Sequence, residues 1–286
     1  MHGYHIFIRA LNRNKMENNN DEKLIKNSFK LIQKHCENVH RLKRPNWMRT
    51  SPLFKRICRI LFSQFHVSIF HYVRVFLKDK SGYFFEAGCG RGDLLLLLSN
   101  QFNYLVGCDF SQTFLQDAQE KINHWYNMNK NTRVKIKVLQ HDLNYPLPLE
   151  SASFDAVAAI AVAEHVYDVF FLFRELRRVL KPDGILIVQV PNLAYIKHRV
   201  RLVFGKPLIT QLAPPSRWHI EGYDGGHIHY FTKDSLAMVL KISGFNDLRW
   251  MCSGTLAKIR NFWPSLLGGD LVCIAHAANT IYAQKK

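Results

Sequence analysis

The residues best suited to bind a ligand lie in a glycine-rich loop and at the end of the next predicted strand. The apolar stretch 84–87 runs into three alternate glycines, Gly88, Gly90 and Gly92, and residues 106–109 read as a second strand ending in Asp109. Glycine tolerates positive φ and lets backbone N–H groups approach a ligand closely. An acid about 20 residues beyond such a loop accepts hydrogen bonds from ribose hydroxyls in nucleotide-binding sheets. The pattern therefore predicts a nucleoside site at the carboxyl edge of a parallel sheet.

The elements that must position this site follow in a regular order. Two more apolar strands are predicted after Asp109, the first of them ending just before Asp142. The later predicted elements are helix 169–180, turn 181–184, strand 185–192, helix 233–242 and strands 247–252 and 271–276. Strands that alternate with helices indicate an α/β fold with a doubly wound sheet.

The order of these motifs resembles the class I S-adenosyl-L-methionine-dependent methyltransferases. The loop reads E-x-G-x-G-x-G, and the later segments Ala163-Glu164-His165-Val166 and Leu180-Lys181-Pro182-Asp183-Gly184 also match that family. The resemblance covers about residues 80–280. Within the family, the chain is similar to type 11 and 12 methyltransferases, near the quinone O-methyltransferase, methionine-biosynthesis and polysaccharide-associated branches. The resemblance implies a Rossmann-like fold with a seven-stranded sheet, mostly parallel with one antiparallel strand, and S-adenosyl-L-methionine as cofactor. The cofactor-binding residues that it implies are Glu86, Gly88, Cys89, Gly90, Gly92, Asp109, Phe110, Asp142, Leu143 and Ala161.

Two histidines are the candidate catalytic residues, His227 and His165. His227 matches the histidine of an H-x-x-x-F-T segment found in several of these branches, where it faces the acceptor or bonds the lid backbone. In one interpretation, Glu164 orders the loop over the cofactor and His165 caps the next helix. In the other, His165 is a base, or both residues are metal ligands as in the quinone O-methyltransferases. Those enzymes carry a further acid three residues before the glutamate. Because that position is Ala161 here, we expect no metal.

The positive charge is concentrated in the N-terminal part of the chain. Residues 1–80 hold 17 lysines and arginines against 5 acidic residues, and we expect a basic helical segment there, with Met16 as an alternative start. Residues 57–77 are long enough to span a membrane, but Arg59 and Arg74 argue against a span. One or two helices packed beside the first strand are expected, or a basic surface that meets anionic lipid. Residues 81–286 form the predicted methyltransferase domain, with an acceptor lid at about 193–231.

The predicted reaction is methyl transfer to a small-molecule, glycan or lipid-linked acceptor, at oxygen. The segment after the fourth strand reads Ala161-Val162-Ala163-Glu164 rather than the Asn/Asp-Pro-Pro-Tyr of many amine and base methyltransferases. Two alternatives remain: a methyltransferase-like cofactor-binding protein that acts with a partner enzyme, and an RNA methyltransferase. Nucleic acid is the less favoured partner because the chain has no recognised RNA-binding module. The six cysteines show no metal-finger spacing, and buried free thiols in a cytoplasmic protein are expected, with peripheral membrane contact left open.

Overall fold

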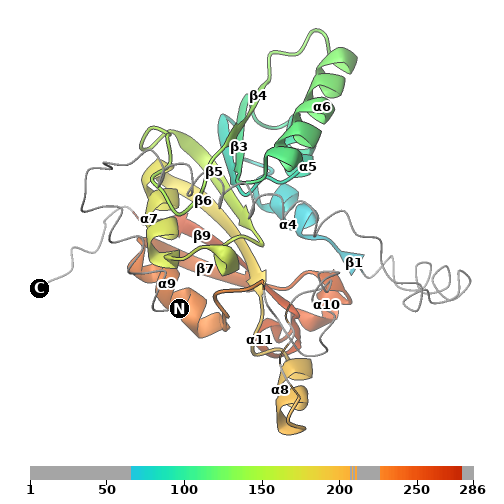
Figure 1. The fold of residues 1–286 in the computed structure, drawn as a ribbon, viewed down its shortest axis with the longest axis vertical. Helices are drawn as coiled ribbons and strands as arrows, with labels where there is room; N and C mark the ends of the chain where they lie inside the picture. Colours follow the sequence, from blue (N-terminus) through green and yellow to red (C-terminus); the bar gives the residue numbers. More distant parts are fainter. Residues whose placement is uncertain (1–65, 207, 209, 211–225, 279–286) are drawn as a thin grey trace, which may run out of the picture. The chain divides into compact units, whose positions relative to one another are not determined.

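A computed structural model describes residues 66–206, 208, 210 and 226–278 of the chain (Figure 1). All of these residues belong to one compact unit. The predictions for the basic N-terminal helices, and for the middle of the lid, fall on residues 1–65 and 211–225 and lie outside the described residues. The elements, in chain order, are β1 (His66–Val67), α4 (Ile69–Phe76), β2 (Tyr83–Ala87), α5 (Asp93–Leu97), β3 (Tyr104–Asp109), α6 (Gln112–Met128), β4 (Lys135–Gln140), β5 (Phe154–Ile160), η2 (Ala163–His165), α7 (Val169–Val179), β6 (Leu180–Pro191), α8 (Ile196–Val203), α9 (Lys233–Ile242), β7 (Phe245–Met251), β8 (Gly254–Thr255), α10 (Ala257–Arg260), α11 (Pro264–Leu267) and β9 (Asp270–Ala277).

Seven strands form the central sheet, in the order β4-β3-β2-β5-β6-β9-β7. The strands from β4 to β6 are parallel, and β9 runs antiparallel to both of its neighbours, β6 and β7. This confirms the predicted seven-stranded, doubly wound fold. The chain steps outward from β2 to β3 and β4 and then returns to place β5 on the other side of β2. Ligands bind at such a topological switch point, beside the carboxyl ends of the strands.

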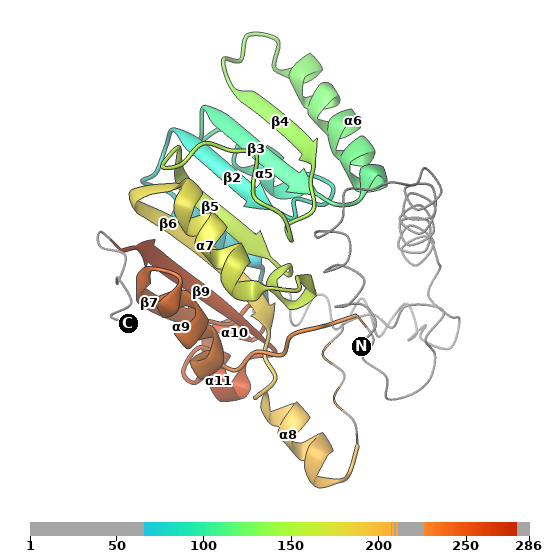
Figure 2. The ribbon, with the colours of Figure 1, turned by 60° about the vertical axis from the view of Figure 1, so that its left-hand side comes forward.

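Helices cover both faces of the sheet, as the ribbon shows (Figure 2). On one face, Phe85 of β2 and Val157 of β5 belong to a core that includes α7 and α9. On the other face, Phe84 packs in a core with residues of α4, α5 and α6. Alternate residues of one strand therefore enter opposite cores, as the period of two requires. By this alternation Glu86, two residues after Phe84, faces the layer of α4, α5 and α6.

The strand that follows α7 begins earlier than the sequence predicts. Residues 181–184 were expected to form a turn, yet β6 runs from Leu180 to Pro191. The pairing with β5 explains why this stretch resembles a turn and yet belongs to a strand. Phe154 pairs with Leu180 and Ala156 pairs with Ile185, so residues 181–184 lie opposite a single residue of β5. Residues 181–184 thus form a bulge within one strand, with Asp183 at a φ of 61°. Hydrogen bonding on both sides of the bulge makes it part of β6, which periodicity alone does not reveal.

The described parts of the N-terminal segment and of the lid are short. Helix α4 lies within residues 57–77, where one or two helices beside the first strand were expected, and Val73 of α4 and the following Leu77 are buried in the core on that face of the sheet. No helix among the described residues is long and apolar enough to cross a membrane. Helix α8 lies at the start of the predicted lid, and its apolar side chains are exposed: Val203 is 81% exposed, whereas His198 is only 7% exposed. Four of the cysteines, Cys89, Cys108, Cys252 and Cys273, are buried free thiols, as expected.

Candidate functional site

Four loops at the carboxyl ends of β2 to β5 carry the predicted cofactor residues. The first loop turns through Gly88, Gly90 and Gly92, whose φ angles are 72°, 50° and 71°. Glycine is favoured at each of them because L side chains rarely adopt this region. A Cβ added at Gly88 would lie 2.2 Å from Cγ2 of Val162, so this glycine lets the loop after β2 pack on the loop after β5. The loops of the two strands that flank the switch point are therefore in contact.

Asp109 joins the glycine loop to the end of β3. Its Oδ2 accepts a hydrogen bond from the backbone N–H of Gly90 at 2.8 Å, and its Oδ1 accepts one from Ser111 at 2.8 Å. Each carboxylate oxygen has two acceptor sites, so both oxygens retain capacity for a pair of hydroxyls. The carboxylate is half-buried and fixed by two backbone donors. This arrangement is suited to a ribose.

Glu86 is a second carboxylate at the same edge, and it is buried. Its Oε2 accepts no hydrogen bond from any described residue. Burial, followed by the neighbouring carboxylates of Asp109 and Asp93, raises the pKa of the Glu86 carboxyl well above its ordinary value. A buried polar atom without a partner is costly, and a cationic ligand would offset that cost. The orphaned oxygen is the observation that fits a positively charged cofactor at this edge.

The remaining predicted cofactor residues are placed in different ways. Asp142 follows β4, and its Oδ1 accepts hydrogen bonds from the backbone N–H and the side-chain amide of Asn144. Leu143 is partly buried and packs against the core of α7 and α9. Ala161 has a φ of 54° in the turn after β5. Phe110 follows β3 directly, and its carbonyl accepts a hydrogen bond from Gln140 at 3.1 Å.

The Cys89 side chain enters the core instead of the ligand side of the loop. A Cβ built on Gly107 would lie 2.7 Å from the Cys89 sulfur, so the thiol packs over β3. Burial is the main cause that raises the pKa of the Cys89 thiol far above its ordinary value. The thiol therefore stays protonated and inert, and only the Cys89 backbone belongs to the loop surface.

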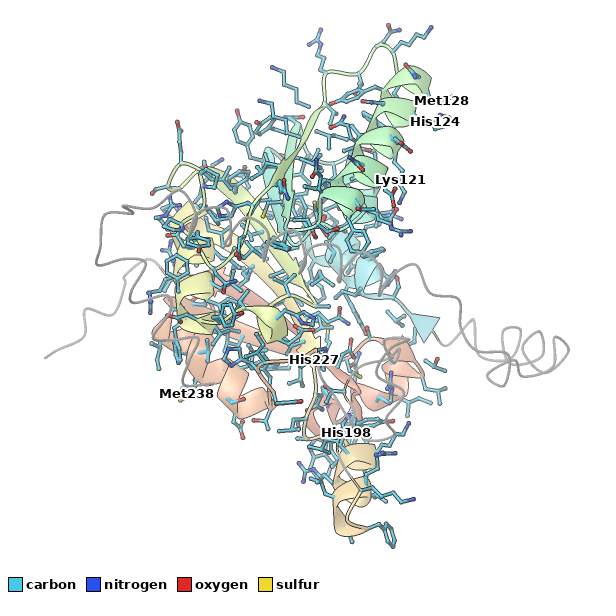
Figure 3. The ribbon with its side chains drawn as sticks, in the orientation of Figure 1. Lys121, His124, Met128, His198, His227 and Met238 are labelled. Atoms are coloured by element: carbon cyan, nitrogen blue, oxygen red, sulfur yellow. The ribbon has the colours of Figure 1, made fainter. Side chains whose placement is uncertain are left out.

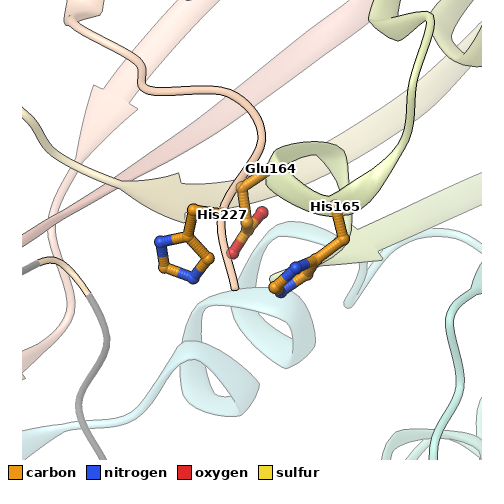
Figure 4. A group of neighbouring side chains, drawn as sticks. All are labelled: Glu164, His165 and His227. Atoms are coloured by element: carbon orange, nitrogen blue, oxygen red, sulfur yellow. The ribbon is translucent and has the colours of Figure 1, made fainter. Parts of the chain in front are cut away.

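The two predicted catalytic histidines lie side by side, with Glu164 between them (Figure 4). The ring centroids of His165 and His227 are 5.0 Å apart. The predicted helix cap by His165 is wrong, because Asp168 caps α7 by accepting from the Phe171 N–H at 2.8 Å. Instead, Nδ1 of His165 contacts the Gly226 carbonyl at 2.8 Å. His165 therefore links η2 to the segment that carries His227.

Backbone hydrogen bonds hold that segment in place. The Glu164 carbonyl accepts from the N–H groups of Ile228 and His229, at 2.8 and 3.2 Å. At its far end, the segment meets β6, where Leu193 donates to the Phe231 carbonyl at 2.8 Å. Residues 226–231, the lid's last described part, thus lie across the ends of β5 and β6. Sequence reasoning did not include Glu164 among the site residues, although the adjacent Glu164-His165 pair was the available signal.

A separate surface hollow lies away from these groups. Its volume is about 500 Å³, and its lining is Leu96, Glu120, Lys121, His124, Trp125 and Met128. Figure 3 shows Lys121, His124 and Met128 along α6 and His227 on a different part of the molecule. The hollow contains none of the predicted site residues. It is therefore not the candidate active site.

Comparison with known proteins agrees with this geometry. Residues 85–188 match a family model described as a methyltransferase domain. The chain is 27% identical to a demethylmenaquinone methyltransferase of Staphylococcus haemolyticus over 169 residues, which are 56% of this chain and 67% of the relative. It is 28% identical to a probable S-adenosylmethionine-dependent methyltransferase of Mycobacterium tuberculosis, over 58% of this chain and 49% of the relative. The chain thus spans about half the length of the mycobacterial relative.

Solved structures show the same fold. A possible histamine N-methyltransferase from Thermotoga maritima gives a TM-score of 0.52 at 16% identity, covering 79% of this chain and 96% of the other. An S-adenosylmethionine-dependent methyltransferase from Mesorhizobium loti gives 0.50 at 20% identity, covering 72% and 95%. Residues 85–188, which match the family model, contain the glycine loop, Asp109 and the Glu164-His165 pair.

Proposed function

Because the chain belongs to the class I S-adenosylmethionine-dependent methyltransferases, we propose that it methylates an oxygen of a small-molecule, glycan or lipid-linked acceptor. The observation that carries the choice of oxygen is the grouping of Glu164 and His165, which follow β5, with His227 of the lid segment. A hydroxyl must lose a proton during methylation, and imidazoles are the usual groups that assist. The demethylmenaquinone methyltransferase relative supports a small-molecule acceptor.

The cofactor is proposed to lie across the carboxyl ends of β2, β3 and β4. Asp109 would accept from both ribose hydroxyls, and Asp142 would accept from the adenine amino group. Phe110 and Leu143 would border the nucleoside, and the glycine loop would contact the amino-acid part through its backbone. Glu86 would compensate the positive charge of the ammonium group. The acidic character of this edge suits S-adenosylmethionine, which carries a positive sulfonium.

The bound cofactor supplies an activated methyl group on sulfur. In the proposed transfer, a lone pair of the acceptor oxygen would form the new C–O bond, and the electron pair of the broken C–S bond would remain on the sulfur of the leaving S-adenosylhomocysteine. The hydroxyl proton leaves at the cluster formed by Glu164, His165 and His227. The protein's main contribution is alignment of the in-line displacement and exclusion of water. Turnover of labelled S-adenosylmethionine with hydroxylated acceptors tests the proposal, and methylation of amines or carbons only would contradict the choice of oxygen.

The His227→Ala variant is expected to lose most of kcat while its affinity for S-adenosylmethionine stays within about twofold. His227 lies on the lid segment, whereas the cofactor residues lie on the loops after β2 to β4. Groups that assist proton removal contribute about 10²- to 10⁴-fold. Steady-state kinetics across pH, with calorimetry for the cofactor, measures both effects. Weaker acceptor binding with an unchanged kcat would show that His227 only holds the lid.

Glu86→Gln is expected to stabilise the cofactor-free protein and to weaken cofactor binding. The folded-state pKa of Glu86 is raised, so the free energy of unfolding falls as pH increases from the ordinary carboxyl range through the folded pKa. The positively charged cofactor binds the ionised form of Glu86 more tightly than the protonated form, so cofactor affinity should increase over the same pH range. Thermal unfolding and calorimetry in a pH series measure this. Glu120→Gln, at an exposed position of α6, is the control, and equal cofactor affinity of wild type and Glu86→Gln would contradict the assignment.

A further inference from the structure

Helix α8 turns its apolar side chains toward solvent. Ile196, Val200 and Val203 recur at helical spacing, and all three are exposed. Phe204, which directly follows the helix, is 73% exposed. The buried residue of α8 is instead His198. A helix of a globular domain normally turns its apolar stripe toward the core, so the exposed stripe of α8 indicates contact with another surface.

A second group of exposed apolar side chains lies between α10 and α11. Phe262 is 91% exposed, and Ile259 and Trp263 are exposed as well. The backbone that carries them is hydrogen-bonded. The Ile259 carbonyl accepts from the Phe262 N–H at 3.1 Å, and the Trp263 carbonyl accepts from the Leu267 N–H at 2.9 Å. A fixed turn loses little conformational freedom on binding, which favours a binding role for these aromatic side chains.

Both groups leave the sheet at the edge that carries the predicted cofactor residues. Strand β6 runs parallel to β5 and ends at Pro191, where it pairs with Asp270. Strand β7 pairs antiparallel with β9, as β6 does, so β6 and β7 end at the same edge. The buried Asn192 side chain donates hydrogen bonds to the carbonyls of Ser265 and Gly268, at 3.0 and 2.8 Å. Helices α8, α10 and α11 accordingly lie together at this edge (Figures 1 and 2).

The two segments that carry these side chains are basic and contain no acid. Residues 192–206 hold four lysines and arginines, residues 252–269 hold two, and neither range contains Asp or Glu. Lys197 lies in α8 and Lys258 lies in α10, and both are exposed. Apolar side chains beside cations, without acids, complement a surface that is both apolar and anionic.

We propose that this docking surface, formed by Val200, Val203, Phe204, Phe262 and Trp263 with the adjacent cations, binds the face of an anionic lipid bilayer. The apolar side chains enter about 5–10 Å into the boundary between head groups and acyl chains. Trp263 has the amphipathic ring that suits this interface. The lysines and arginines remain among the lipid phosphates, where their charge is favourable.

The aliphatic members of the docking surface favour lipid over nucleic acid. Single-stranded nucleic acid is bound by basic grooves and by aromatic rings that stack on bases. Val200 and Val203 offer neither stacking nor hydrogen bonds, but they transfer favourably into hydrocarbon. The residues of the docking surface also lie outside the basic N-terminal segment 1–80, so the inference does not depend on that segment.

Docking refines the acceptor class, and this step rests on the proposed function. The docking surface lies at the edge that carries the predicted cofactor residues, and α8 begins the predicted lid. Binding to a bilayer therefore brings the lid and the cofactor edge to the lipid. Among the proposed acceptors, a lipid-linked molecule that stays partly in the membrane is then favoured over a soluble glycan.

Co-sedimentation of the full-length chain with phospholipid vesicles tests the inference without turnover. The vesicles contain phosphatidylcholine with or without phosphatidylglycerol, and we expect binding that requires the anionic lipid. Phe204→Ser combined with Phe262→Ser should weaken binding by about 10-fold or more, because each aromatic side chain loses its burial in hydrocarbon. Lys197→Gln should weaken it about fivefold, the effect of one cation near an anionic surface. Met128→Ser, at a position of α6 that is 75% exposed, is the control and should bind within about twofold of wild type.

High salt separates the docking surface from the basic residues 1–65. Attraction between exposed charges is screened by salt, whereas burial of apolar side chains is not. The difference between wild type and the variant with both Phe204→Ser and Phe262→Ser should therefore persist at high salt. Calorimetry with S-adenosylmethionine checks that the variants fold, and we expect cofactor affinities within about twofold of wild type, because the predicted cofactor residues lie on other loops.

The outcomes separate the docking surface from the proposed function. Equal vesicle binding by wild type and the double variant would overturn the inference, as would no binding by wild type. A double variant that loses affinity for single-stranded RNA but not for vesicles would also overturn it and indicate nucleic acid as the partner. Methyl transfer by a protein without this vesicle binding would leave the proposed function intact and remove the docking surface. Vesicle binding that depends on Phe204 and Phe262, in a protein that transfers no methyl group, would support the docking surface and contradict the proposed function.

Discussion

The Gly90→Val variant is expected to fold and to have no measurable affinity for S-adenosylmethionine. Apart from its chain neighbours, no atom of the described residues lies within 4 Å of a Cβ built on Gly90, so the valine side chain enters open space beside the loop. The φ of 50° adds a conformational cost of about 1–2 kcal/mol or more for a side chain in the left-handed region. This strain also displaces the Gly90 N–H from Asp109. Calorimetry with the cofactor, beside thermal unfolding without it, measures the two effects separately.

Gly88→Ala is the informative comparison for Gly90→Val. At Gly88 the new Cβ would lie 2.2 Å from Cγ2 of Val162, a contact that requires the loops after β2 and β5 to separate. We therefore expect Gly88→Ala to lower the unfolding temperature as well as cofactor binding. Near-normal cofactor affinity in Gly90→Val would mean that the glycine loop is only a turn. A strong loss of stability in Gly90→Val alone would contradict the open position of its side chain.

Asp109→Ala is expected to weaken S-adenosylmethionine binding by about 10- to 150-fold. Hydrogen bonds to a charged group contribute about 1.5–3 kcal/mol, and 1.4 kcal/mol corresponds to a factor of ten in affinity. The variant also removes the acceptor for the Gly90 N–H, so part of the loss comes from a less ordered loop. Calorimetry with S-adenosylmethionine and S-adenosylhomocysteine measures the change, and both ligands should lose similar affinity because they share the ribose.

Asp117→Ala is the matched control for Asp109→Ala. Asp117 is a carboxylate on α6 that pairs with the exposed Arg91 side chain at 3.2 Å. Exposed ion pairs contribute little to stability, and Asp117 does not belong to the predicted site. We expect its cofactor affinity within about twofold of wild type. Equal losses in both variants would show that general charge, rather than ribose recognition, explains the effect of Asp109.

The sequence determined the order of the elements and the side of the sheet that carries the site. Apolar strands, glycine turns and amphipathic helices are local patterns, and parallel strands joined by helices bring their carboxyl ends to one edge. For this reason Glu86, Asp109 and Asp142 could be assigned to one ligand site before any contact was known. The same local signals placed α9 and the strand β9, and the family resemblance implied an antiparallel strand.

The tertiary structure alone decided how Glu164, His165 and His227 come together. His227 is far from Glu164 and His165 in the sequence, and backbone hydrogen bonds from Ile228 and His229 to Glu164 bring it beside them. The burial of His198 in α8, a helix whose apolar side chains are exposed, is another result of long-range packing. Such contacts depend on which loops meet above the sheet, and no periodic pattern records that choice. The two histidines could therefore be named as site residues from the sequence, but the inclusion of Glu164 and the grouping of the three required the fold.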